Sequence, residues 1–442
     1  MRANNMQVNP LIKAIKEREG SQRTGFYSVC SANELVLRAS IRHAVTHRYT
    51  LIIESTSNQV NQYGGYTGMR PHQFMSEVQM IAKEEGMHTE NLILGGDHLG
   101  PLLWQNENES SAMGKAAELV KAYTLAGFTK IHLDTSMKLS CDPSGPLDIR
   151  VCARRGAVLA KAVYESFALM PEGSVRPVLV IGSEVPIPGG QQNESPKTGT
   201  RGEKEESVTP TSPADFLEQV SIYKDEFQKA GIDFYDVVAF VVQPGVEFGD
   251  DFVCHYDAKK AAPLKAALET LSGLVFEGHS TDYQCPMQLS EMVRDGVAIL
   301  KVGPALTFFL REGLLLLEAI EEIISGELSG FRETLLKEMN DSKQYWEKYY
   351  KGTKEEIEYK KLFSYSDRCR YYLPAEKVQK AIEQLLQNIP RIPPALLSQF
   401  FPLQYRRFMA GELPNDPLSV LCDRIGDLCN DYAGACGFLG AT

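Results

Sequence analysis

Eight short runs rich in β-branched and aliphatic residues recur along the chain, separated by segments long enough to form helices. Near-continuous apolar runs are typical of parallel strands that are covered on both faces. The segments 112–126 and 214–230 illustrate the helices that would connect them. Eight strand–helix units predict a (β/α)8 TIM barrel, with a doubly wound open sheet as the alternative. The predicted strands are residues 25–31, 51–56, 92–98, 130–135, 178–184, 237–243, 274–279 and 298–304.

The strand pattern divides the chain into two parts. We expect residues 1–328 to form the barrel and residues 329–442 to form a helical extension, because the tail has a helical pattern and a cluster of aromatic residues. Such clusters are typical of a core or an interface, so the extension should pack on the barrel or on a partner subunit. The polar segment 189–213 follows the fifth predicted strand, and we expect it to be a mobile loop that acts as a lid.

Composition excludes several classes of protein. The 442 residues carry a net charge of −11 at pH 7, which argues against nucleic acid or an anionic membrane as the main partner. The sequence contains no run of 18 apolar residues, so no membrane span is expected. The polar N-terminus lacks the apolar segment of a signal peptide. Nine cysteines without a CxxC pair fit reduced thiols, so we expect a cytoplasmic protein.

Polar side chains stand at the ends of most of the predicted strands. In TIM barrels the carboxyl ends of the strands carry the active site, so these residues predict a shared pocket. They are Glu54, Asp97, His98, Asp134, Glu184, Gln243, His279 and Lys301. Two histidines and a carboxylate suit a divalent metal ion such as Zn, Mn, Co or Ni. The predicted metal ligands are His98, Glu184 and His279, with Gln243 as a fourth.

The remaining strand-end residues are candidates for proton transfer. Asp97 would either accept a proton from a substrate hydroxyl held on the metal or orient His98. Glu54 and Asp134 are further acid–base candidates, with a structural ion pair to Lys301 as the alternative. We expect the other histidines, including His132 in the middle of the fourth strand, to be ordinary core or surface residues.

Several hydroxyl and amide side chains are candidates for substrate binding. Ser280, Thr281 and Lys301 could hold an anionic end of the substrate, because late barrel loops often bind phosphate. The loop after the second strand, residues 55–68, is dense in amides, hydroxyls and glycine, which suits a ligand with many hydroxyl groups. The candidates near the first two strands are Ser31, Asn58 and Gln59.

Several longer motifs indicate a known family. They are Ser28–Ala32, Glu54–Gln62, Gly64–Met69, Gly95–Pro101, Val242–Phe248, His279–Gln284, Lys301–Phe308 and Ser366–Arg368. With these motifs the chain resembles the GatZ/KbaZ family of tagatose-1,6-bisphosphate aldolase subunits. The resemblance implies a barrel related to class II aldolases. Asp97 and His98 look like the Asp-His pair of those enzymes, and Gly278-His279-Ser280 looks like their glycine-rich histidine segment. Gln243 stands where those aldolases would carry another histidine.

The resemblance implies two alternative functions. The one we expect is a metal-dependent C4 epimerase of fructose and tagatose or their 6-phosphates, acting by retro-aldol and aldol chemistry at the C3–C4 bond. The alternative is a non-catalytic, stabilising subunit of a class II tagatose-1,6-bisphosphate aldolase. The partners would be a ketohexose or its phosphate, together with further copies of the chain or an aldolase subunit.

Overall fold

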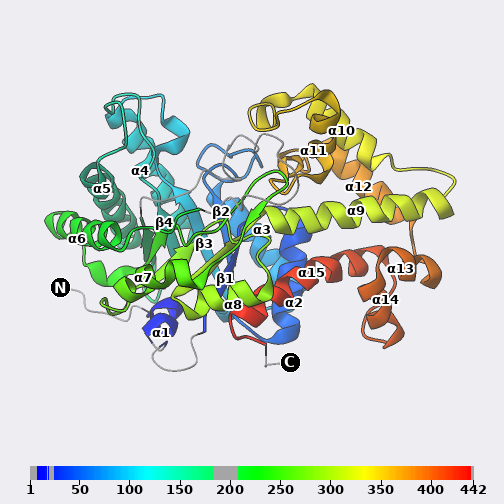
Figure 1. Cartoon of the computed structure of the whole chain (residues 1–442), viewed down its shortest axis with the longest axis horizontal. Coiled ribbons are helices and arrows are strands. Elements are labelled where there is room, and N and C mark those ends of the chain that lie inside the picture. Colours follow the sequence, from blue (N-terminus) through cyan, green and yellow to red (C-terminus); the bar gives the residue numbers. More distant parts are fainter. Residues whose placement is uncertain (1–6, 17, 19–23, 183–207, 440–442) are drawn as a thin grey trace.

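The computed structural model describes residues 7–16, 18, 24–182 and 208–439. Its centre is a closed barrel of parallel strands in the order β1-β10-β9-β6-β5-β4-β3-β2 (Figure 1). Each strand overlaps one predicted run, so the predicted TIM barrel is confirmed. The strands are β1 Phe26–Val29, β2 Leu51–Thr56, β3 Leu92–Leu99, β4 Lys130–Leu133, β5 Val178–Ile181, β6 Val237–Val242, β9 Val275–Gly278 and β10 Val297–Val302.

Helices follow the strands and surround the barrel (Figure 1). Several begin at a residue whose side chain accepts a hydrogen bond from a free amide of the first turn, such as Asn33, Asp148 and Ser212. A two-stranded hairpin, β7 Glu247–Phe248 and β8 Val253–Cys254, follows β6. The barrel helices are α1 Pro10–Lys16, α2 Glu34–His47, α3 Pro71–Glu84, α4 Glu109–Ala126, α5 Ile149–Phe167, α6 Pro213–Lys229, α7 Ala258–Leu268, α8 Pro286–Arg294 and α9 Pro304–Ile324.

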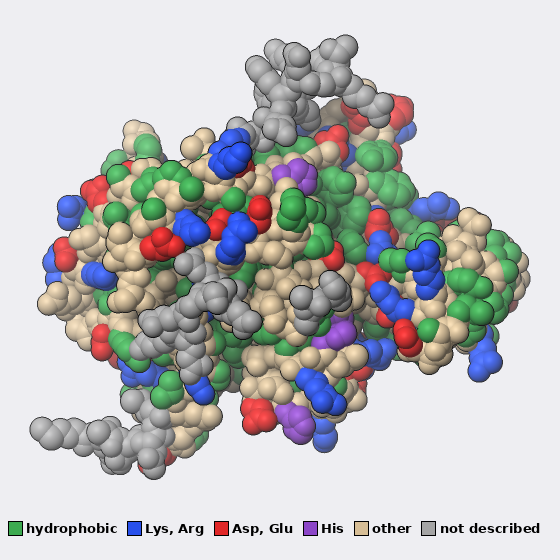
Figure 2. Space-filling model, turned by 60° about the horizontal axis from the view of Figure 1, so that its bottom comes forward, with side chains coloured by type: hydrophobic (Ala, Val, Ile, Leu, Met, Phe, Trp, Pro, Cys, Tyr) green, Lys and Arg blue, Asp and Glu red, His purple; other side chains and the backbone are tan. Residues whose placement is uncertain are grey.

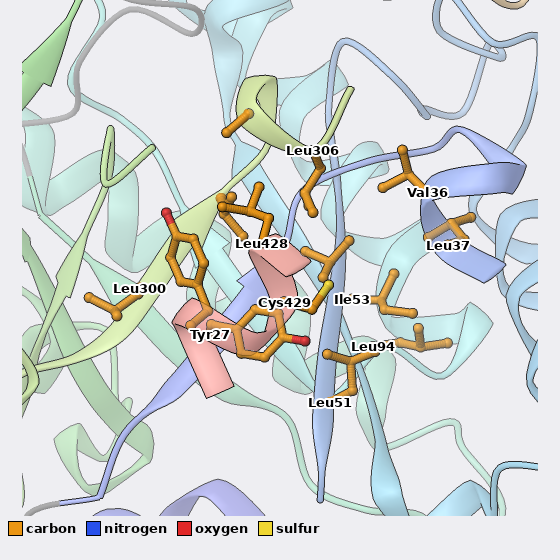
Figure 3. Close-up of a cluster of buried hydrophobic side chains, with 14 of the residues drawn as sticks. Tyr27, Val36, Leu37, Leu51, Ile53, Leu94, Leu300, Leu306, Leu428 and Cys429 are labelled. Carbon is orange, nitrogen blue, oxygen red and sulfur yellow. The ribbon is translucent and has the colours of Figure 1, made fainter. Parts of the chain in front are cut away.

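The C-terminal helices extend away from the barrel and then return to it. Helix α9 projects outward, and α15 runs back beside α2 and α8 (Figure 1). Leu428 and Cys429 of α15 enter the same buried cluster as Tyr27 of β1 and Leu300 of β10 (Figure 3). The last helix thereby covers the outer face of the barrel next to β1. The helices after α9 are α10 Phe331–Asp341, α11 Lys354–Phe363, α12 Glu376–Asn388, α13 Pro394–Phe400, α14 Pro402–Met409 and α15 Pro417–Ala435.

The division of the chain at residue 328 stays a prediction. The predicted lid lies outside the described residues from 189 to 207, and residues 208–212 lead directly into α6. The helices of the described ranges include none that is long and apolar enough to cross a membrane. On the face drawn in Figure 2, acidic and basic side chains are interspersed, and neither sign dominates.

Glycines of the β3 region allow two close approaches beneath the site. A Cβ atom on Gly95 would lie 2.7 Å from Cγ of Glu54 on the neighbouring strand. A Cβ atom on Gly100 would lie 1.6 Å from the backbone oxygen of Asp134. Only glycine leaves room for these contacts, so the glycine-rich sequence of β3 sets how closely Glu54 and Asp134 approach it.

Candidate functional site

A network of buried charges fills the barrel interior. Nζ of Lys130 lies 2.7 Å from Oε1 of Glu54 and 2.6 Å from Oε2 of Glu277. Nζ of Lys301 lies 2.6 Å from Oε2 of Glu54 and 3.0 Å from Oδ1 of Asp97. Burial alone would raise the pKa of Glu277, but Lys130 and Lys301 outweigh it and hold that pKa well below its usual range. Three carboxylates therefore share two ammonium groups, and each charge has a partner.

Three imidazole rings meet above this network. The ring centroids of His98 and His132 lie 5.3 Å apart, and the ring of His279 lies 5.0 Å and 5.2 Å from those two. Burial outweighs the nearby Glu277 and lowers the pKa of His279 to about 4. The His279 ring is therefore neutral at pH 7 and keeps a lone pair free for a ligand.

Asp134 and Asp97 hold His98 in a strained position. His98 has a positive φ of 50°, and the pairing of β3 with β4 is irregular between Gly96 and Leu99. Its Nδ1 lies 3.0 Å from Oδ2 of Asp134. Burial lowers the pKa of His98, but Asp97 and Asp134 outweigh burial and raise it. The two carboxylates therefore stabilise the protonated form of His98 relative to a free imidazole.

Four of these side chains have the chemistry of a metal site. One ligand atom from each lies within 4.8 Å of the others, and the four residues are Asp97, His132, Glu277 and His279. Nε2 of His132 is buried without a hydrogen-bond partner, while its Nδ1 lies 2.7 Å from Oδ1 of Asp97. A buried nitrogen without a hydrogen-bond partner is suited to bind a ligand, such as a metal ion. These residues fit a divalent ion, although Lys130 and Lys301 already share the two carboxylates.

The predicted metal ligands occupy different places. His279 belongs to the group of four, and His98 lies beside it with Nδ1 turned to Asp134. The side-chain oxygen of Gln243 accepts hydrogen bonds from the amides of Gly245 and Val246, at 2.8 and 3.0 Å. Glu184 lies outside the described residues. The four predicted assignments stay predictions.

Metal titration distinguishes the metal ligands predicted from the sequence from the four potential ligands that lie together in the structure. We expect His132→Ala and His279→Ala to weaken Zn²⁺ binding at least tenfold, because in this arrangement each would be a direct ligand. His98→Ala should have a smaller effect, since its Nδ1 already pairs with Asp134. Calorimetry of the metal-stripped protein, with His43→Ala as a control outside the site, provides the measurement. Equal weakening by His98→Ala and His132→Ala would contradict this assignment.

An open pocket lies over the imidazole cluster. Its walls come from the ends of β1, β2, β3, β9 and β10, from the hairpin, and from the C-terminal extension. The polar lining is rich in hydroxyls, amides and charged groups, which suits a small polar ligand. The lining residues include Asn58, Gln59, Tyr66, Asp97, His98, His279, Ser280, Asp282, Lys301, Arg370 and Tyr371.

Some predicted substrate contacts face this pocket and others do not. Asn58, Gln59, Ser280 and Lys301 line it. Oγ of Ser31 instead accepts the amide of Asn33 at 3.2 Å, next to the start of α2. The hydroxyl of Thr281 donates to the backbone oxygen of Lys301 at 2.7 Å. Glu54 pairs with Lys301, which is the structural alternative stated for it, and Asp134 pairs with His98.

The structure adds residues that sequence reasoning missed. His132, expected to be an ordinary core histidine, lies in the imidazole cluster, and Lys130 and Glu277 complete the charge network. The sequence does contain one signal for these residues. Residues 130, 132 and 134 alternate as Lys, His and Asp, and residues 277 and 279 as Glu and His. Alternate residues of a strand face the same side, so polar residues at this spacing point together into the barrel.

Comparison with known proteins identifies the family. The family model described as D-tagatose-1,6-bisphosphate aldolase subunit GatZ/KbaZ-like matches residues 11–437. The D-tagatose-1,6-bisphosphate aldolase subunits GatZ of Salmonella agona and Salmonella heidelberg are each 42% identical over 428 residues, which is 96% of this chain and 98% of theirs. A solved structure described as a probable tagatose 6 phosphate kinase from Sinorhizobium meliloti 1021 is 39% identical, with a TM-score of 0.82, and covers 93% of this chain and 100% of that one. The chain therefore belongs to the GatZ/KbaZ-like family of D-tagatose-1,6-bisphosphate aldolase subunits.

Proposed function

We propose that the chain is a subunit of a tagatose-1,6-bisphosphate aldolase and that its pocket binds a ketohexose phosphate. The observation that carries this proposal is the 42% identity, over 96% of the chain, to proteins described as such subunits. A non-catalytic aldolase subunit is thus better supported than the C4 epimerase expected from the sequence.

The charges in the barrel fit a subunit that assists another one. Asp97 is held ionised, because His98, Lys301 and His132 together outweigh burial and keep its pKa well below its usual range. A carboxylate with such a low pKa is a weak proton acceptor at neutral pH. The interior is therefore well suited to bind and orient a polar ligand and less suited to abstract a proton.

Reconstitution with an aldolase subunit tests the proposal. The chain is purified alone and together with a co-expressed class II aldolase subunit, and cleavage of tagatose 1,6-bisphosphate is followed in each preparation. We expect co-purification, and a higher activity or longer half-life of the aldolase subunit in the mixture. An aldolase subunit whose activity and half-life are the same with and without the chain would overturn the proposal.

The imidazole cluster favours a C4 epimerase as a second candidate. An ionised carboxylate, two histidines and an ammonium group, from Asp97, His98, His279 and Lys301, face one pocket. In this reaction a base takes the proton of the C4 hydroxyl, the C3–C4 bond breaks, and its electron pair forms an enediolate at C2–C3. The aldehyde then rotates, the enediolate attacks its other face to re-form the C3–C4 bond, and the base returns the proton to the C4 oxygen. Lys301 and His98 would stabilise the enediolate oxygens.

A divalent ion held by Asp97, His132, Glu277 and His279 would polarise the sugar oxygens. Incubation of the chain alone with fructose 6-phosphate, with and without Zn²⁺ or Mn²⁺, tests the epimerase. Appearance of tagatose 6-phosphate in the carbon NMR spectrum supports it. An unchanged spectrum under all these conditions excludes it for this substrate pair.

A further inference from the structure

The C-terminal extension contributes a wall of the pocket. A short 3-10 turn, η5 Arg368–Tyr371, lies between α11 and α12, and its residues Arg370 and Tyr371 line the pocket together with Ser280 and Lys301 of the barrel. The ring of Tyr371 packs edge-on against that of Tyr66, with centroids 5.0 Å apart. The pocket is therefore built from both parts of the chain.

A buried ion pair holds this turn in place. Oδ1 of Asp367 lies 2.9 Å from Nε of Arg311 on α9, and its Oδ2 accepts the hydroxyl of Thr307 at 2.6 Å. Asp367 itself has a positive φ of 44°. A non-glycine residue in this conformation persists only where its surroundings fix it, and such residues concentrate at ligand sites.

The turn presents two cations that lack a carboxylate partner. Within the described ranges, neither Arg368 nor Arg370 has a carboxylate oxygen within 4.0 Å. Arg370 donates to the backbone oxygens of Ser366 and Asp367 and to the hydroxyl of Tyr371. Arg368 is 2% exposed and stacks on the ring of Tyr349, and its Nε and Nη2 have no hydrogen-bond partner. Arg370 is the one of the two that lines the pocket, and because a half-buried charge without a counter-charge is costly, it favours an anion there.

Apart from Asp97, the acid that lines the pocket is already engaged by backbone amides. Asp282 lines the pocket, but its Oδ1 accepts the amides of Gly303 and Ala305 at 3.0 and 2.8 Å, at the start of α9. Burial raises the pKa of Asp282 to about 6, despite these hydrogen bonds. The start of α9 thus holds this carboxylate through two backbone amides.

We propose that Arg370 binds the phosphate group of the substrate, so that the C-terminal extension supplies the anion subsite of the barrel pocket. The guanidinium matches a phosphate with two parallel hydrogen bonds, and Tyr66 and Tyr371 wall the subsite. Lys301 and Asp97 then face the sugar. This inference names the residue that selects phosphorylated sugars, and it rests on the proposed function only for the identity of the sugar.

Calorimetric titration with inorganic phosphate, tagatose 6-phosphate and tagatose tests the subsite. We expect Arg370→Gln to weaken the binding of tagatose 6-phosphate and of phosphate at least tenfold and to leave the binding of tagatose unchanged. Arg370→Lys should have an intermediate effect. Arg176→Gln is the matched control. That arginine also stacks on a tyrosine, Tyr164, but pairs with Asp236 and lies outside the pocket.

The outcomes separate this inference from the proposed function. Equal weakening of tagatose and tagatose 6-phosphate by Arg370→Gln indicates a structural role and overturns the subsite. So does an unchanged affinity for tagatose 6-phosphate, or a wild-type protein that prefers tagatose. Stimulation of an aldolase subunit is scored in a separate assay. Its loss with an intact phosphate preference would overturn the proposed function and leave the subsite standing.

Discussion

Replacement of Lys130 by methionine is expected to lower the free energy of unfolding by about 3–5 kcal/mol at pH 7, as is typical when one partner of a buried ion pair is removed. Lys130 is fully buried and contacts both Glu54 and Glu277. Without it, Oε2 of Glu277 loses its ion-pair partner, and only Oε1 keeps contacts, with Nε2 of His279 at 3.1 Å and Nζ of Lys301 at 3.7 Å. Urea denaturation followed by circular dichroism measures the loss.

The pH dependence gives this prediction a second readout. Because the pKa of Glu277 is lowered in the folded protein, its contribution to stability is complete above its unfolded pKa of about 4.3 and is lost as the pH falls through the lowered value. In Lys130→Met that pKa rises. The difference in stability between wild type and variant should therefore shrink as the pH is lowered toward 4.3 and below.

Two variants control for the loss of a lysine as such. Lys161→Met removes an exposed lysine that lies 3.9 Å from Glu165, and it should change stability by about 0.5 kcal/mol or less. Lys130→Met combined with Glu54→Gln should recover part of the loss, because it removes one of the stranded charges. A deficit below about 1 kcal/mol that does not vary with pH would contradict the charge network.

The barrel could be predicted from the sequence because each strand is buried on both faces. Runs such as Val237–Val242 and Val297–Val302 are apolar at almost every position, and eight of them in series leave few alternative topologies. The place of α15 could not be predicted in this way. Its apolar stripe fits any hydrophobic surface, and only the assembled fold shows that Tyr432 of α15 donates to the backbone oxygen of Thr281.

The site residues could be predicted only where an ionisable side chain stands at the end of a strand. Asp97, His98, His279 and Lys301 were found because each follows or ends a strand, and all four line the pocket. Gln243 also follows a strand, but its side-chain oxygen accepts a hydrogen bond from an amide of the adjacent turn. The position of a residue in the sequence does not reveal this competing local interaction. Arg370 carries no local signal. It reaches the pocket through contacts made by residues distant in sequence, such as Asp367 with Arg311.

The ion pair between Asp367 and Arg311 leads to the second large predicted effect on stability. We expect Asp367→Asn to lower the free energy of unfolding by about 3–5 kcal/mol, because it leaves the guanidinium of Arg311 without its carboxylate. Arg311 is 1% exposed, its Nη1 and Nη2 already lack hydrogen-bond partners, and an arginine cannot shed its charge. Asparagine tolerates a positive φ well, so the backbone of residue 367 is not the source of the loss.

The same substitution should also disturb the pocket. Since Asp367 fixes the turn that carries Arg370, Asp367→Asn should weaken tagatose 6-phosphate binding, even in protein that remains folded. Asp423→Asn is the matched control, because it makes the same chemical change in a half-exposed pair with Arg407 and should cost about 1 kcal/mol or less. If Asp367→Asn and Asp423→Asn prove equally mild in urea denaturation, the buried pair does not anchor the extension. The wall that Arg370 and Tyr371 provide must then be held by the aromatic contacts around Tyr66 and Tyr345 alone.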